Sequence, residues 1–150
     1  MSYLTHSSYT PRFIELSLSA DQSISSSSAT TVNFDTIRGD TGHGVSLVAG
    51  GNGRIRFSAN RYYWCFGTAA IDRDSNTTNY DASFFDTSGT ELTAEQGNFK
   101  SSCAVGNNAE SRISQLVFSP TSQTDYDFKV TGETGTLMSD GSTLIIIEMS

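Results

Sequence analysis

Two histidines, His6 and His43, are the only imidazole groups in this chain of 150 residues. Serine hydrolases use such a group as the base that activates a serine, and an aspartate orients it. His43 lies near Asp35 and Asp40 in the sequence, so the residue types of a triad are present. The sequence contains no G-x-S-x-G elbow and no other triad signature, however. We interpret His43 as a loop residue and expect that the protein is not an enzyme.

Carboxylates form two groups that could bind a cation or hydrolyse a sugar. Asp72, Asp74 and Asp81 surround a polar loop and could offer oxygen ligands to calcium. Their spacing does not match the calcium loop of helix–loop–helix proteins, so we interpret the loop as a solvated turn and expect no metal site. Asp125 and Asp127 alternate with aromatic residues on a predicted strand and are expected to face water. Glycoside hydrolysis requires a defined separation of two carboxylates in space, which sequence spacing does not establish.

The tripeptide Arg38-Gly39-Asp40 is of the type that integrins bind, and it lies in a predicted loop. Integrin binding would require an exposed turn and an animal-cell partner. We interpret the tripeptide as a glycine turn between two charged residues, and we assign it no role.

The composition excludes several classes of protein. The formal net charge is -7, and the nine lysines and arginines are scattered singly, whereas nucleic-acid binders cluster them. No segment approaches the roughly 20 apolar residues of a membrane helix. Residues 1–6 lack the basic start and apolar run of a secretory signal. We therefore expect no binding to nucleic acid and no membrane insertion.

The two cysteines, Cys65 and Cys103, are too few for a small disulfide scaffold. No C-x-x-C pair and no Cys/His ligand spacing indicates a zinc site. We expect two unpaired thiols and no cofactor.

The distribution of small polar residues favours strands. Serine and threonine supply 42 of the 150 residues; both compete for helical backbone hydrogen bonds, and threonine suits strands. Residues 23–31 are predicted to be a polar connector, and 92–96 and 109–116 could alternatively form short helical turns. Strands separated by turn residues are typical of a sandwich or barrel, here a single domain. The predicted strands are 13–18, 32–37, 44–48, 54–57, 62–71, 80–85, 98–105, 111–118, 126–130 and 144–149.

The strand predicted over 62–71 is apolar on both faces. If Tyr62, Trp64 and Phe66 point one way, then Tyr63 and Cys65 point the other. The closing run over 144–147, L-I-I-I, also lacks any polar alternation. A two-layer sandwich covers only the inner face of each sheet, so two such strands predict that one sheet packs against other copies of the chain.

Three segments resemble the tumour necrosis factor and complement globular-head superfamily. Residues 32–37, V-N-F-D-T-I, resemble its early V-x-F-D-T-V strand. Residues 53–64 resemble its G-x-F … A-G-x-Y-x-F block, with Asn60 where the family usually has glycine. Residues 141–147 resemble its closing strand. Because asparagine accepts a left-handed backbone better than most residues, Asn60 is compatible with this pattern.

The resemblance implies a ten-stranded, antiparallel two-sheet jelly roll that assembles as a tight homotrimer. It also implies that the central and closing strands line the threefold axis. The trimer interface is therefore expected to contain Tyr62, Trp64, Phe66, Leu144 and Ile146.

Residues 1–11 are polar, end at Pro11 and are predicted to form an N-terminal arm, with the jelly-roll domain over 12–150. Proline limits the extension of a strand ladder, and a terminus of this kind stays loose unless something binds it. We expect the arm to be an attachment element that uses Tyr3, Leu4 and Tyr9.

This chain resembles the small stand-alone members of the superfamily that have Ser/Thr-rich strands. Such members look like bacteriophage virion proteins: capsid decoration proteins, head fibres and tail-fibre tips. The resemblance therefore implies a non-enzymatic virion structural protein, located in the virion and partnered by capsid or tail proteins, with a decoration or host-attachment role. The alternative is a soluble carbohydrate- or receptor-binding module of the same fold, whose partner would include a host surface glycan. Exposed aromatic residues in loops would favour the alternative, and Tyr80 and Phe99 are the candidates.

Overall fold

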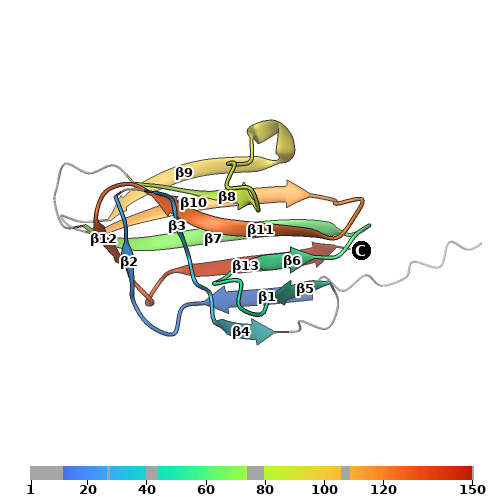
Figure 1. Ribbon diagram of the computed structural model, residues 1–150, viewed down its shortest axis with the longest axis horizontal. Coiled ribbons are helices and arrows are strands. Elements are labelled where there is room, and N and C mark those ends of the chain that lie inside the picture. Colours follow the sequence, from blue (N-terminus) through green and yellow to red (C-terminus); the bar gives the residue numbers. More distant parts are fainter. Residues whose placement is uncertain (1–11, 27, 40–43, 74–79, 106–108, 150) are drawn as a thin grey trace, which may run out of the picture.

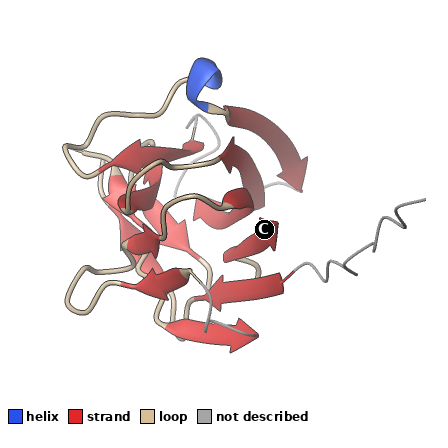
Figure 2. Ribbon diagram, turned by 90° about the vertical axis from the view of Figure 1, so that its right-hand side faces the viewer, coloured by secondary structure: helices blue, strands red, loops and turns tan. Residues whose placement is uncertain are grey.

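The computed structural model describes residues 12–26, 28–39, 44–73, 80–105 and 109–149. The described residues form thirteen β-strands and one short 3-10 helix. The strands belong to two antiparallel sheets, here called sheet A and sheet B, which pack face to face (Figures 1 and 2). The prediction of an all-β, antiparallel two-sheet sandwich is confirmed.

Sheet A is organised around its longest strand, β7 (Tyr62–Arg73). One side of β7 pairs with β10 (Ala109–Phe118), and the other side pairs first with β13 (Thr143–Met149) and then with β12 (Gly135–Leu137). Two strands form opposite edges of the sheet in Figure 1: β9 (Asn98–Val105), which pairs with β10, and β4 (Thr36–Gly39), which pairs with β1. The remaining strands are β1 (Arg12–Ser17), which pairs with β13, and β2 (Gln22–Ile24), which pairs with β12.

Sheet B is organised around β11 (Thr124–Thr131). Its other strands are β3 (Thr30–Thr31), β5 (Val45–Leu47), β6 (Ile55–Phe57) and β8 (Asp81–Asp86). The 3-10 helix η1 (Ala94–Gln96) connects β8 to β9 and stands at the edge of the molecule beside β9 (Figure 1).

Most of the predicted strands are present, but some segments differ from the prediction in their strand content or bounds. The segment over 23–31, predicted to be a polar connector, contains the end of β2 and all of β3. The strand predicted over 32–37 begins only at Thr36. Val32 and Phe34 are nevertheless buried, because the backbone N–H of Val32 donates to the carbonyl of Phe128 and holds this segment over the core. The predicted helical alternative over 109–116 is wrong, since β10 occupies it, whereas a helical turn does form within 92–96.

The space between the sheets is filled by aromatic and aliphatic side chains. Phe57 packs against Tyr63 and Phe118, with ring centroids 5.0 and 4.9 Å away. Phe128 of sheet B lies over Gly67 of sheet A, where a Cβ atom would approach the ring to 2.4 Å. Glycine at this position therefore lets the two sheets approach each other around the Phe128 ring.

Asn60 has a φ of 59°, in the left-handed region that its resemblance to a glycine position required. Its backbone N–H donates to the carbonyl of Pro120, which ties the turn before β7 to the end of β10. Asn60 therefore adopts the left-handed backbone that makes it compatible with a glycine position.

Candidate functional site

The side chains of β7 divide into two rows. Tyr63 and Cys65 are fully buried in the core, whereas Tyr62 is 59% exposed and Trp64 is 38% exposed on the outer side of sheet A. Phe66 is half-buried on the same outer side, and its ring centroid lies 4.7 Å from that of Trp64. Both faces are apolar, as the sequence predicts, but sheet B covers only one of them.

The side chains of β13 divide in the same way, which corrects part of the predicted interface. Leu144 and Ile146 have no exposed surface and belong to the hydrophobic core, so they cannot form a contact with another copy. Ile145 and Ile147, which the prediction omitted, are half-buried on the outer side. The four residues are chemically alike, and the pairing of Ile146 with Cys65 decides which of them face inward.

Strand pairing gathers the outward residues into one surface. Phe13, Ile147, Trp64 and Val117 are successive register partners across β1, β13, β7 and β10. Ile145 and Phe66 are partners in the next row. We define the sheet A face as Phe13, Tyr62, Trp64, Phe66, Val117, Ile145 and Ile147.

Polar residues limit the sheet A face on two sides. Towards β4, Glu15 lies beside Ile145 in register and forms an ion pair of 3.8 Å with Arg38. Towards β9, Gln115 separates Phe66 from Phe99 in register. The apolar surface is therefore a central patch with polar borders, a distribution that is typical of an interaction surface.

The opposite surface of the sandwich, formed by sheet B, carries ion pairs. Arg56 forms two hydrogen bonds of 2.8 Å with Asp125, and Arg54 forms two of 2.9 Å with Asp127. Lys129 lies 3.6 Å from Asp127. The prediction that both aspartates simply face water is wrong, and Asp127 is buried. The hydrogen bonds that Arg56 donates lower the pKa of Asp125, and the hydrogen bonds that Asp127 accepts raise the pKa of Arg54.

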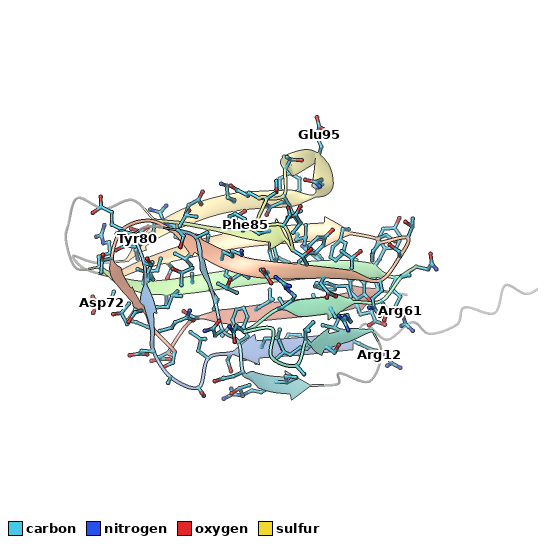
Figure 3. All side chains as sticks on the ribbon, in the orientation of Figure 1. Arg12, Arg61, Asp72, Tyr80, Phe85 and Glu95 are labelled. Atoms are coloured by element: carbon cyan, nitrogen blue, oxygen red, sulfur yellow. The ribbon has the colours of Figure 1, made fainter. Side chains whose placement is uncertain are left out.

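The residues considered for a catalytic triad or a calcium site do not form such a site in the described part of the chain. His6, His43, Asp40 and Asp74 lie outside the described residues. Asp72 is exposed at one end of the molecule, at the opposite end from Arg61 (Figure 3). Within 12–26, 28–39, 44–73, 80–105 and 109–149, no three His, Cys, Asp or Glu side chains are grouped so that they could hold a metal ion.

Other predicted residues occupy ordinary structural positions. Arg38 is exposed on β4, an edge strand, and Gly39 has a φ of 96°. Cys65 is a free, buried thiol whose pKa is raised by burial, and the side chain of Cys103 lies outside the described part. The expected attachment residues Tyr3, Leu4 and Tyr9 also lie outside it. None of the described helices is both long enough and apolar enough to cross a membrane.

The two candidate loop aromatics differ. Tyr80 is buried and donates a hydrogen bond of 2.8 Å to the carbonyl of Thr134, so it has a structural role. Phe99 is 55% exposed on the edge strand β9. Only Phe99 is therefore available to a ligand.

No protein-family model matches the sequence, and no curated protein is significantly similar to it in sequence. The crystal structure of murine APRIL at pH 8.0 is similar in fold, with a TM-score of 0.60 and 15% identity over 93% of this chain and 100% of that chain. The murine APRIL structure at pH 8.5 gives 0.60 and 16% over the same shares. Eiger TNF from S. frugiperda gives 0.54 and 10% over 95% of this chain and 93% of that chain. The chain thus has a TNF-like jelly-roll fold, and the predicted fold class is confirmed.

Proposed function

We propose that this protein is a non-enzymatic structural module that assembles as a homotrimer through the sheet A face and is displayed on a bacteriophage capsid or tail. The observation that carries the assembly is the position of the exposed large hydrophobic residues. Among the described residues, four of the exposed large hydrophobic residues belong to the sheet A face: Phe13, Tyr62, Trp64 and Val117. The other two, Ile37 and Phe99, lie outside it. Soluble proteins rarely leave such a contiguous apolar surface without a partner.

The two outer surfaces of the sandwich support different roles. The ion pairs of sheet B satisfy the charges of that surface internally, so sheet B is suited to face solvent. In a closed ring of three, the sheet A face of each copy would lie towards the threefold axis and pack against the two other copies. The number three rests on the resemblance to the tumour necrosis factor and complement globular-head superfamily.

The mass in solution tests the assembly. We expect analytical ultracentrifugation to give about three times 16.2 kDa at micromolar concentration. Trp64→Asp should yield a folded monomer, since an unpaired charge in an interface core is costly. Ser46→Asp, on the exposed part of sheet B opposite Arg56, is the matched control and should remain a trimer. A wild-type protein that sediments as a stable monomer would overturn the proposal.

The virion setting rests on the resemblance of the Ser/Thr-rich strands to small bacteriophage members, and the arm over 1–11 is its proposed attachment element. The first described strand begins at Arg12, so removing residues 2–10 spares the described sandwich. The deletion should leave the trimer and its melting temperature nearly unchanged but abolish incorporation into particles. Normal occupancy of the truncated protein on purified particles would instead assign attachment to the jelly-roll loops.

A second function, a soluble carbohydrate- or receptor-binding module of the same fold, is favoured by the exposed Phe99 ring. A module of this kind would bind its ligand as a free protein, whereas a purely structural virion component would bind only its particle. Pull-down of purified particles and binding of the free protein to glycans therefore distinguish the two functions.

A further inference from the structure

A groove outside the sheet A face lies along the edge of β9. It has a volume of about 490 Å³, which is within the range of small-molecule sites, and its lining includes Glu91, Thr93, Asn98, Phe99 and Lys100. Successive strand residues point to opposite faces, so a groove that is lined by both Phe99 and Lys100 follows the edge of the strand. Helix η1 stands beside it, with Glu95 pointing away from the sandwich (Figure 3).

Hydrogen bonds fix the walls of this groove before any ligand arrives. The Asn98 amide donates to Ser83 Oγ at 2.8 Å and to the Leu92 carbonyl at 2.6 Å. Ser114 Oγ donates to Asn98 Oδ1 at 2.9 Å. Asn98 is therefore fully used as a structural support, and binding would cost little further ordering of the walls.

Phe99 is the exposed element of the groove. More than half of its side chain is accessible, and Gln115 separates it from Phe66 and thus from the sheet A face. The ring contributes little to the hydrophobic core. An accessible aromatic ring offers a flat apolar surface on which another flat apolar surface can stack.

The one ammonium group of this region pairs with two carboxylates, so the three groups together keep a net charge of -1. Lys100 Nζ lies 2.5 Å from Asp81 Oδ2 and 2.7 Å from Glu91 Oε1, and Ser83 Oγ donates to Glu91 Oε1 at 2.8 Å. The ammonium group is thus already neutralised and would not select an anion. The same groups retain donors and acceptors on their exposed sides, which suits a neutral ligand with many hydroxyl groups.

We propose that this groove binds a neutral saccharide, with one pyranose ring stacked on Phe99 and its hydroxyl groups directed to Glu91 and Lys100. A pyranose combines an apolar face of C–H groups with a rim of hydroxyl groups, which matches both parts of the groove. An added β-strand is a poorer fit, because a lysine on an edge strand opposes pairing. The site rests on the second proposed function and specifies its ligand class, and it does not depend on the assembly or on the number of subunits.

Saturation-transfer NMR on the full-length protein tests this site with three neutral probes: N-acetyl-D-glucosamine, methyl α-D-mannopyranoside and methyl β-D-galactopyranoside. N-acetylneuraminic acid is the anionic comparison. We expect signal transfer to the ring C–H protons of at least one neutral probe and weaker transfer to the anion. Phe99→Ala should weaken binding by about 3- to 10-fold, the factor that loss of an aromatic contact produces. Ile37→Ala removes an exposed hydrophobic side chain on β4, at the opposite edge of sheet A from β9 and outside the sheet A face, and should leave binding unchanged.

Three results would overturn the site. The first is that none of the neutral probes binds to the wild-type protein. The second is that Phe99→Ala and Ile37→Ala change binding equally. The third is that Phe99→Ala lowers the mass in solution, which would make Phe99 a contact between copies. Loss of assembly in Trp64→Asp with retained sugar binding would refute neither the groove nor its ligand, so the two proposals fail separately.

Discussion

Replacing Gly67 by alanine should separate the two sheets locally. A Cβ atom at this position would lie 2.4, 2.5 and 2.8 Å from three carbon atoms of the Phe128 ring, whereas ordinary contact begins at 3.4 Å. The ring would have to move by about 1 Å, the difference between 3.4 and 2.4 Å. Phe84 and Phe34 pack against Phe128, with ring centroids 5.1 and 6.2 Å away, and resist this movement. We expect a loss of about 3 kcal/mol in the free energy of unfolding, at the upper end for overpacking.

A second substitution makes the cause identifiable. Phe128→Leu alone should cost about 1–3 kcal/mol, because it leaves a partly filled space in the core. Combined with Gly67→Ala it should cost at least about 1 kcal/mol less than the sum, since the added methyl group then occupies that space. Phe57→Leu is the matched control: Phe57 is equally buried but packs against Tyr63 and Phe118, so its effect should add to that of Gly67→Ala.

Urea unfolding followed by circular dichroism and by the fluorescence of the single tryptophan, Trp64, measures these changes. All variants must be compared at one protein concentration, because assembly would shift the midpoint. Strict additivity of Gly67→Ala with Phe128→Leu, or a cost of Gly67→Ala below about 0.5 kcal/mol, would refute the view that this contact sets the local sheet separation.

Three further predictions concern the surface of sheet B and the core. Asp127→Asn should lower the free energy of unfolding by about 1–3 kcal/mol in urea titrations, because Arg54 loses a charged bidentate partner at a buried position; an unchanged midpoint would contradict this. Arg56 lowers the pKa of Asp125 in the folded protein, so this ion pair stabilises the fold fully above the pKa of Asp125 in the unfolded chain, about 4. The stabilisation is lost as the pH falls from there through the lower pKa of the folded protein. Asp125→Asn should therefore flatten the decrease of the urea midpoint between about pH 5 and 3, and an identical profile would exclude this pair as a contributor. Cys65 should react with a thiol reagent only after unfolding, since burial raises its pKa and blocks access; labelling of the native protein, located by mass spectrometry, would show that this core position opens.

The sequence predicts strands well where they are long, and less well where they are short. The bounds of β9 agree with the prediction, and β7 extends it by only two residues, to Arg73. Strand β12, with the sequence G-T-L, was missed because three residues after a turn carry no periodic signal. The segment around Val32 has the composition of a strand, but only part of it joins a ladder.

The site was predicted in part. Of the residues predicted for the trimer interface, Tyr62, Trp64 and Phe66 lie on the outer side of sheet A. Leu144 and Ile146 lie in the core instead, because a run of like aliphatic residues does not reveal which row points inward. The pair of Arg54 and Asp127 could not be predicted, since its members are 73 positions apart in the chain. Phe99 carried a signal as an aromatic residue near a turn, but its exposure depends on β9 being an edge strand.

The aliphatic run of β13 also constrains how this chain can change length. Leu144 and Ile146 fill the core, while Ile145 and Ile147 lie on the opposite side of the strand. In β13, even-numbered residues therefore point inward and odd-numbered residues point outward. Insertion of one residue before Leu144 would exchange the two sets and turn Glu148, now a buried partner of Arg61, towards the outer side. Insertion of two residues would restore the same orientation. Within this strand, viable insertions and deletions should therefore come in pairs.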